Sequence, residues 1–189
     1  AKEIKLFLTQ FDTEAFAKDY KLSTQVAARE LRYNWFYELL NDNNFDYLLT
    51  AHHADDNLET FLINLSRGTG IDGLTGIPTE NAQVIRPLLQ FSREQISQYA
   101  HENNISWRED SSNASDKYLR NKIRHDLIPI LKEINPNFLS SFQKTQNYLQ
   151  EAKVMVEDAS IMIYQQVAQE VGDDIHFDIK QLIRLSNYK

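Results

Sequence analysis

The order of apolar segments along the chain is the feature that most constrains its fold. Residues 4–8 form an apolar run typical of a strand, and Ser23 can cap a helix that reaches about Leu40. A buried strand is then expected over 46–51 and an amphipathic helix over 55–66. Strands that alternate with helices pair in parallel, because each helix returns the chain to the end where the next strand starts. We therefore predict an α/β fold with a parallel sheet.

The middle of the sequence is expected to alternate loops and helices. After a glycine-rich segment over 67–76, a short strand can form at 84–85, and a capping box over 92–95 starts another helix. The next helix is expected to end near Ile128, because Pro129 lacks the amide hydrogen that a helix interior needs.

The longest predicted helix opens at Asn135-Pro136 and ends at Gly172, and it is followed by a strand over 175–179 with no obvious partner. Its apolar residues recur in steps of four and three, which favours packing against another helix over self-association. The sequence leaves a homodimer open. We predict a first domain over residues 1–134 and a second, mainly helical part over 135–189.

The composition limits the classes of protein. With 189 residues, of which 42% are apolar, the chain can build one substantial core, or a core and a small appendage. It has no cysteine, which excludes disulfides and thiolate metal sites. No apolar run approaches the roughly 20 residues that cross a bilayer. We expect a cytoplasmic protein with no membrane segment.

Polar side chains gather where the second predicted strand meets its helix. His52 follows the strand, while Asp56 and Glu59 lie about 60° apart on the helix, away from its apolar stripe. Asp55 lies closer to that stripe and is expected to cap the helix. Carboxylates and an imidazole in one pocket can bind an ammonium group, hold Mg²⁺ or move a proton. The alternative is a structural role, with carboxylates as helix caps and histidines satisfied at the strand end.

A basic stripe lies further along the chain. Lys117, Arg120 and Arg124 fall on one helix face with no acidic residue among them, although the chain has a net charge of −7. Guanidinium groups bind phosphates through paired hydrogen bonds, so the stripe fits a nucleotide or an RNA backbone. The alternative is a solvated helix face. The glycine-rich segment follows a helix instead of opening one, so it does not predict a phosphate cradle, and a plain mobile loop is an equal alternative.

Taken together, six segments resemble the tRNA(Ile)-lysidine synthetases, a branch of the PP-loop ATP pyrophosphatases. The segments are Ala27-Ala28-Arg29-Glu30-Leu31-Arg32-Tyr33; His52-His53-Ala54-Asp55-Asp56 with Glu59-Thr60; Arg67-Gly68-Thr69-Gly70 with Gly73-Leu74; Arg86-Pro87-Leu88-Leu89; Trp107-Arg108-Glu109-Asp110-Ser111-Ser112-Asn113; and Arg120-Asn121-Lys122-Ile123-Arg124-His125. Six ordered blocks over roughly residues 16–136 are far more specific than any single motif. The resemblance implies an incomplete Rossmann-like sheet, like that of adenine nucleotide alpha hydrolases, followed by a helical linker.

The resemblance also implies a two-step reaction on the wobble cytidine of the CAU anticodon of tRNA(Ile). ATP, with Mg²⁺, would adenylate the C2 oxygen of the base, and the ε-amine of free lysine would then displace AMP, which changes the codon read from AUG to AUA. Three kinds of site residue are implied: one that contacts ATP or the adenylated intermediate, Arg32; those that surround the base and the lysine, His52, Asp56 and Glu59; and those that bind tRNA or nucleotide, Lys117, Arg120 and Arg124.

The sequence departs from this family in one respect. The family's Ser-Gly-Gly-x-Asp-Ser loop, which wraps the ATP phosphates, is absent together with the strand and helix beside it, and both ends look like cuts. We therefore expect a piece of a longer enzyme that has no synthetase activity by itself. Detection of pyrophosphate release from ATP by this chain with tRNA would contradict that expectation.

Three other functions are weighed against lysidine synthesis. A PP-loop enzyme of tRNA thiolation commonly uses cysteines, and the chain has none. A dinuclear metal phosphohydrolase could use His52, His53, Asp55 and Asp56 as ligands, and tightly bound zinc or manganese in the purified protein would favour it. A non-catalytic module could bind RNA or a protein through the basic stripe and the long helix.

Overall fold

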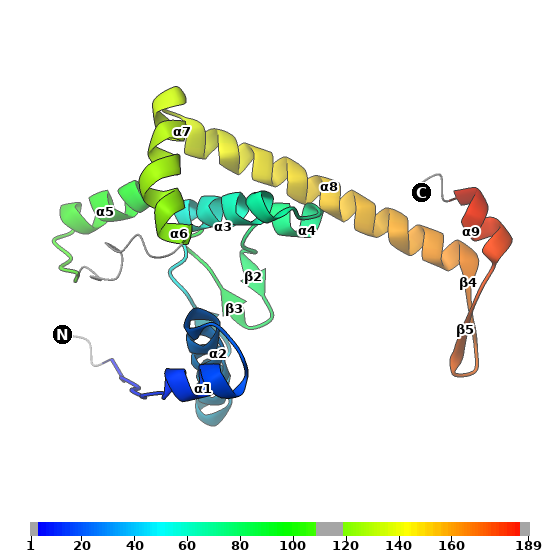
Figure 1. Cartoon of the computed structure of the whole chain (residues 1–189), viewed down its shortest axis with the longest axis horizontal. Coiled ribbons are helices and arrows are strands. Elements are labelled where there is room, and N and C mark those ends of the chain that lie inside the picture. Colours follow the sequence, from blue (N-terminus) through cyan, green and yellow to red (C-terminus); the bar gives the residue numbers. More distant parts are fainter. Residues whose placement is uncertain (1–3, 109–118, 186–189) are drawn as a thin grey trace. The chain divides into compact units, whose positions relative to one another are not determined.

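The computed structural model describes residues 4–108 and 119–185 and shows a mixed α/β protein (Figure 1). Its internal contacts separate two compact units. The first unit contains residues 1–50 and 80–85, and the second contains residues 51–79 and 86–189. None of the described helices combines the length and the apolar character that a membrane crossing requires.

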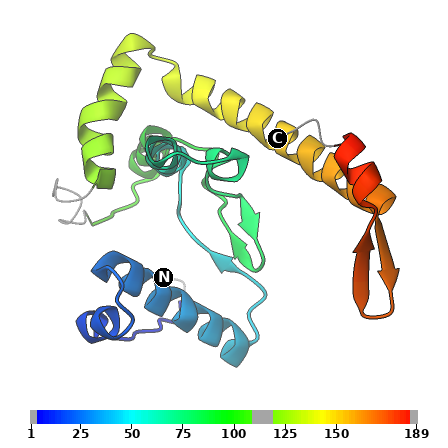
Figure 2. The same ribbon diagram turned by 45° about the vertical axis from the view of Figure 1, so that its right-hand side comes forward.

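Two helices packed side by side make up most of the first unit (Figure 2). The sequence analysis did not predict α1 (Thr13–Asp19), whose first turn is capped by the carboxylate of Asp12. In contrast, α2 (Thr24–Asn43) begins after Ser23, as predicted, and ends slightly later than predicted. It stops where Asn44 adopts the left-handed conformation, with φ of 51°.

The first unit also holds a sheet of three short strands in the order β1-β3-β2. β1 (Leu48–Leu49) and β3 (Val84–Ile85) run parallel, whereas β2 (Glu80–Asn81) runs antiparallel to β3. The predicted parallel pairing is therefore confirmed for β1 and β3. A wider Rossmann-like sheet is not formed by the residues that the structure describes.

Two strand predictions are wrong in this unit. Residues 4–8 form no strand, and Ile4 is 84% exposed. The predicted buried strand over 46–51 shortens to β1, in which Leu49 is 65% exposed. Hydrogen bonds to neighbouring strands hold a strand in place. Among the described residues, β1 has a neighbour along one edge only and residues 4–8 have none.

Helices dominate the second unit, which also ends in a small hairpin and carries the larger core. Its elements are α3 (Ala54–Arg67), α4 (Ile71–Leu74), α5 (Arg93–Glu102), α6 (Leu119–Lys122), a π-helical turn (Ile123–Leu127), α7 (Ile128–Ile134), α8 (Phe138–Val167), β4 (Ala168–Val171), β5 (Asp174–Phe177) and α9 (Ile179–Leu185). The apolar stripe of α3 is buried at its start, where Leu58 packs with Ile123, Ile128 and Phe142, but Leu65 near the end of the helix is 54% exposed. The first half of α8 thus lies along α3 and α4 (Figures 1 and 2).

Pro129 does not end its helix, contrary to the prediction. The chain continues as α7 to Ile134, with the proline in the first turn. The amide of Ile128 donates to the carbonyl of Ile123, five residues back, so the α-helical hydrogen-bond pattern is already interrupted there. A proline that lacks an amide hydrogen is tolerated at such a position.

The region after α8 also differs from the prediction. The long helix ends at Val167 and not at Gly172, because Gly172, with φ of 67°, forms the turn of a β4–β5 hairpin. The strand that was predicted without a partner therefore pairs with β4. The predicted domain boundary between residues 134 and 135 stays a prediction.

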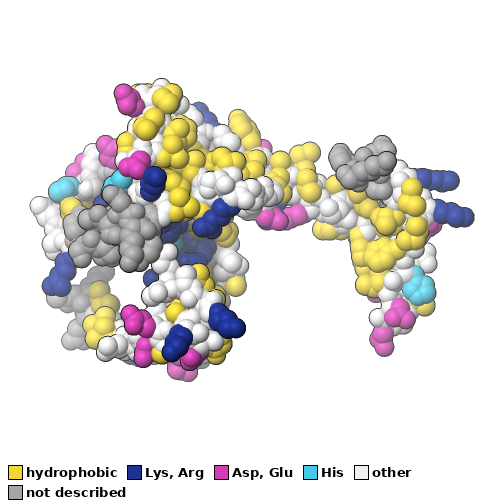
Figure 3. All heavy atoms as spheres, viewed as in Figure 1, with side chains coloured by type: hydrophobic (Ala, Val, Ile, Leu, Met, Phe, Trp, Pro, Cys, Tyr) yellow, Lys and Arg dark blue, Asp and Glu magenta, His cyan; other side chains and the backbone are white. Residues whose placement is uncertain are grey.

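Hydrophobic side chains gather over the second half of α8, the hairpin and α9 (Figure 3). Met155 is 72% exposed and Met162 is 61% exposed, whereas Phe142 in the first half of the helix is buried. The predicted packing seam of α8 therefore finds a helical partner in its first half.

The glycine-rich segment is bracketed between two helices. Asn64 of α3 donates to the carbonyl oxygen of Gly73 at 2.9 Å, and the side-chain oxygen of Asn57 accepts the amide of Ile77 at 2.7 Å. From α8, Gln146 donates to the carbonyl of Leu74 at 2.7 Å. These side-chain amides tie the segment to α3 and α8, while the alternative of a plain mobile loop stays a prediction.

Gly76 is the least replaceable glycine of this segment. Its φ is +71°, and a Cβ there would meet the side-chain oxygen of Asn57. We expect Gly76→Ala to lower the free energy of unfolding by about 2–3 kcal/mol in denaturant titrations. Gly68→Ala is the control, because Gly68 also has a positive φ of +73° but open space around it, so only the conformational cost of about 1 kcal/mol applies. Equal losses in the two variants would contradict the steric argument.

Candidate active site

The first turn of α3 is closed by a reciprocal pair of hydrogen bonds. His53 caps the helix: its Nδ1 accepts the amide of Asp56 at 3.3 Å, and its own amide donates to Asp56 Oδ2 at 3.0 Å. The prediction that Asp55 is the cap is wrong, because the extended backbone that a cap requires occurs at His53. Asp56 thus has a structural role at one oxygen and leaves the other free for a second partner.

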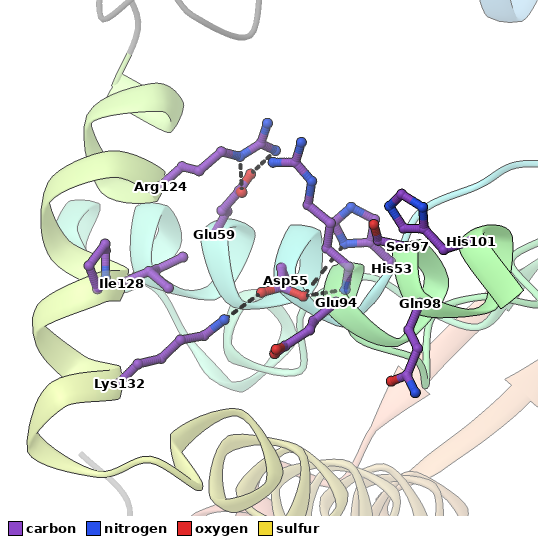
Figure 4. A pocket seen from close by; sticks show the side chains of 12 residues that line it. His53, Asp55, Glu59, Glu94, Ser97, Gln98, His101, Arg124, Ile128 and Lys132 are labelled. Atoms are coloured by element: carbon purple, nitrogen blue, oxygen red, sulfur yellow. Dashed lines mark hydrogen bonds and ion pairs between the residues drawn. The ribbon is translucent and has the colours of Figure 1, made fainter. Parts of the chain in front are cut away.

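Glu59 lies at the centre of an ion-pair cluster. Its carboxylate is fully buried and accepts from Arg124 Nε at 2.6 Å and from Arg124 Nη2 at 3.0 Å (Figure 4). Arg120 Nε lies 3.2 Å from the same carboxylate, and Arg124 Nη2 also lies 3.4 Å from Asp56 Oδ1. The structure therefore brings together four of the predicted site residues, two carboxylates and two guanidinium groups.

The surroundings of Arg124 favour its charged form. A side-chain hydrogen bond from Arg124 to Glu59, with the negative charges of Asp56 and Asp55 nearby, raises the pKa of Arg124 although burial acts in the opposite direction. Arg120 also donates to the hydroxyl of Thr60 at 2.9 Å. Both arginines therefore contact α3, and the side chain of Arg124 is 20% exposed whereas that of Arg120 is 45% exposed. Leu119 and Leu127 are 46% and 39% exposed, whereas Ile123 is buried and anchors the helical segment that carries the arginines.

A polar hollow of about 660 Å³ opens beside this cluster. Its lining comes from the start of α3, from α5 and from the helical segment 124–132, and comprises His53, Asp55, Glu59, Arg93, Glu94, Ser97, Gln98, His101, Arg124, Ile128, Pro129 and Lys132. Figure 4 shows Arg124 and Lys132 on one side of α3 and the side chains of α5 on the other. The arrangement offers both signs of charge to a ligand.

The sequence analysis missed the α5 side of this pocket. It predicted the capping box, and Ser92 and Gln95 do exchange hydrogen bonds of 3.0 and 2.8 Å as predicted. Nothing in the local pattern indicates which neighbour α5 packs against. Its position comes from longer-range bonds, in which the amide of Ala54 donates to Phe91 at 2.9 Å and that of Arg93 donates to Asp55 at 2.8 Å.

Comparison with known families identifies the first two thirds of the chain. A family model described as a PP-loop domain matches residues 1–131. The chain belongs to the PP-loop domain family. The resemblance to PP-loop proteins that was stated from six sequence blocks is thereby confirmed.

This PP-loop protein is similar to curated proteins named tRNA(Ile)-lysidine synthase. The protein of that name from Bacteroides thetaiotaomicron is 44% identical over 146 residues, which is 77% of this chain and 34% of the relative. Those from Thermosipho africanus and Bacillus subtilis are 46% and 39% identical, over 71% and 80% of this chain. These alignments cover 32% and 33% of the two relatives. The chain thus spans about a third of the length of these relatives.

Three predicted site residues of the PP-loop domain remain, namely His52, Arg32 and Lys117. His52 is half-buried in the segment before α3 and is not among the residues that line the pocket. Arg32 is exposed on α2, in the other unit. Lys117 lies outside the described residues. Among residues 4–108 and 119–185, no group of three or more histidine, aspartate or glutamate side chains is placed to hold a metal ion.

Asp55 makes the acid stability of the PP-loop domain depend on pH. Burial acts to raise its pKa, but the amide of Arg93 and the charge of Lys132 outweigh burial, so the pKa is lowered. A carboxylate whose pKa is lower in the folded than in the unfolded state stabilises the protein at pH values above the unfolded-state pKa. This stabilisation is lost as the pH falls through the folded-state pKa. We expect the stability difference between wild type and Asp55→Asn to shrink as the pH falls from neutral into the acid range. A constant difference in urea unfolding across that range would refute this role.

Proposed function

We propose that the protein is a tRNA(Ile)-lysidine synthase, which joins free lysine to the wobble cytidine in the CAU anticodon of tRNA(Ile). The observation that carries the proposal is the cluster in which Glu59 and Asp56 meet Arg120 and Arg124 beside a polar pocket. Similarity to relatives of that name over most of the chain supports it. In this proposal ATP, with Mg²⁺, activates the base, and the reaction takes place in the cytoplasm. No described residue is assigned as a ligand of the metal.

The proposed reaction has two steps. The C2 carbonyl oxygen of the cytidine attacks the α-phosphorus of ATP, and pyrophosphate leaves. The deprotonated ε-amine of lysine then attacks C2, and AMP leaves with the former carbonyl oxygen. The product is lysidine, which changes the codon read from AUG to AUA. The second step therefore needs a group that binds an ammonium ion and a group that accepts its proton.

Asp56 and Glu59 suit the amine half of this reaction. Carboxylates bind an ammonium group through charge-assisted hydrogen bonds, and either carboxylate can accept the proton that nitrogen loses on attack. His52, which directly precedes the helix cap, is proposed to lie beside the reacting base. These side chains belong to one strand-to-helix junction, the place where α/β proteins most often bind ligands.

Arg120 and Arg124 suit the phosphate half. Negative charge builds up on the phosphate as AMP departs, and fixed guanidinium groups offset it. We propose that these arginines and Lys117 bind the nucleotide or the tRNA backbone, and that Arg32 contacts ATP or the adenylated base.

We propose that the ion pairs at Glu59 are exchanged when lysine and the phosphate bind. An ammonium group that binds Glu59 can replace an arginine there, so the buried carboxylate keeps a positive partner throughout. Arg120, whose side chain is 45% exposed, is the arginine that can turn away to a phosphate. Binding of the lysine ammonium group to Glu59 would release Arg120 to bind the phosphate. We therefore expect lysine and the phosphate each to strengthen the binding of the other.

The test compares carboxylate and arginine variants in the full-length protein. This term is used for a protein that contains this chain and has the full length of its relatives. Asp56→Ala is expected to reduce lysine incorporation into tRNA(Ile) by about 100-fold or more while tRNA binding is retained. Arg120→Ala is expected to weaken tRNA or nucleotide binding. If Asp56→Ala left incorporation intact while the arginine variant abolished RNA binding, a non-catalytic RNA-binding module would be the better account.

A further inference from the structure

Asp55 joins three helices at the wall of the pocket, although the proposed chemistry does not use it. It belongs to the first turn of α3, and its Oδ2 accepts the amide of Arg93 at the start of α5 at 2.8 Å. Its Oδ1 accepts from Lys132 Nζ of α7 at 3.1 Å. In Figure 4 Asp55 stands between Lys132 and the α5 side chains. One carboxylate thus connects the two walls of the pocket through the helix that carries Glu59.

Each of these two hydrogen bonds restrains the position of one helix. The first amides of a helix have no partner within the helix, so Asp55 supplies an acceptor that fixes the start of α5. Lys132 lies on the helical segment that also carries Arg124, so the bond to Asp55 limits how far that segment can slide along α3. The side chain of Asp55 is 13% exposed and that of Lys132 is 41% exposed, so the carboxylate is the shielded member of the pair.

A second ion pair of the same unit provides the contrast. Lys153 of α8 lies 2.8 Å from Asp72 of α4, but Asp72 is 82% exposed and neither residue lines the pocket. Such a pair is readily replaced by water and contributes little. The two ion pairs therefore differ in the exposure of their carboxylates and in their location. Of the two, only the pair of Asp55 and Lys132 spans the pocket.

We propose that Asp55 is a positioning residue, which holds α5 and α7 at a fixed separation and thereby aligns Arg124 with Glu59. The kinetic consequence of this inference rests on the proposed function, whereas its structural consequence does not. The proposed reaction gives Asp55 no chemical step. A loss of the clamp lets the walls of the pocket move, and a displacement of about 1 Å is enough to slow a reaction by up to about 100-fold.

The structural consequence is tested on the chain itself, which has no cysteine and so accepts site-specific labels. Spin labels are attached at Tyr99→Cys on α5 and Ile130→Cys on α7, which are 62% and 52% exposed. The distribution of distances between the labels is then measured by pulsed electron resonance. We expect Asp55→Ala and Lys132→Ala to broaden it and Asp72→Ala to leave it unchanged. An unchanged distribution in the first two variants overturns the proposal.

The kinetic consequence is tested in the full-length protein, at a temperature at which every variant is folded by circular dichroism. Asp55→Ala is expected to lower kcat for lysine incorporation by about 10- to 100-fold with tRNA binding unchanged. Lys132→Ala should lower kcat in the same way, the double variant should add little further loss, and Asp72→Ala should match wild type. Full kcat in folded Asp55→Ala overturns the positioning role. If wild type itself forms no lysidine, the proposed function fails, while the label distances still decide the clamp.

Discussion

Replacing Glu59 by alanine is expected to lower the free energy of unfolding of this chain by about 3 kcal/mol. Its carboxylate is fully buried and holds Arg124 at 2.6 Å and Arg120 at 3.2 Å. Removal of one member of a buried pair leaves an uncompensated charge, which costs about 3–5 kcal/mol. The two arginine side chains are 20% and 45% exposed, so water relieves part of that cost and places the loss at the lower end. Urea unfolding monitored by circular dichroism measures it.

Two other variants separate the buried charge from the loss of contacts in general. Glu59→Gln keeps the shape and a hydrogen-bond acceptor, so it is expected to cost less than the alanine variant. Glu157→Ala removes an acid that is 58% exposed and lies 3.6 Å from Lys153, and should cost less than about 0.5 kcal/mol. If Glu59→Ala were as mild as Glu157→Ala, the cluster would not be a buried ion-pair site.

The second large effect is expected at Arg124. Arg124→Met keeps the apolar stem of the side chain but removes the donors that reach both Glu59 and Asp56. Glu59 is then left with Arg120, whose side chain is more exposed, and we expect a loss of about 2–3 kcal/mol.

Combining Arg124→Met with Glu59→Gln tests whether the two groups act as a pair. Residues in direct contact show non-additive effects of about 0.5–3 kcal/mol, so the double variant should lose less than the sum of the single losses. Strict additivity in the same unfolding experiment would mean that the 2.6 Å contact contributes nothing to stability.

Local patterns predicted α2, α3 and the start of α5 because the information they use is local. The apolar spacing around Leu58 predicted α3, and the capping box predicted the start of α5. The same logic failed at residues 4–8, where an apolar run makes a strand only if a neighbouring strand is present. It also failed at Gly172, which was taken as a helix end because a turn glycine and a helix-ending glycine look alike in sequence.

The site was harder to predict than the fold. Spacing on α3 placed Asp56 and Glu59 on one face, but it could not show that Glu59 meets Arg124, which lies 65 positions further along the chain. The resemblance to a family named both groups without giving their geometry. The sequence predicted neither the α5 wall of the pocket nor the role of Asp55, because hydrogen bonds from backbone amides such as that of Arg93 leave no trace in a sequence pattern.

The central claim is that the carboxylates around Glu59 serve the amine step and not the activation of the base. The most direct test is to follow both steps in the full-length protein carrying Glu59→Gln, with tRNA(Ile), ATP and labelled lysine. We predict that pyrophosphate release persists while incorporation of lysine falls by about 100-fold or more. Incorporation at the wild-type rate, or loss of pyrophosphate release with incorporation per adenylated tRNA unchanged, would contradict the account.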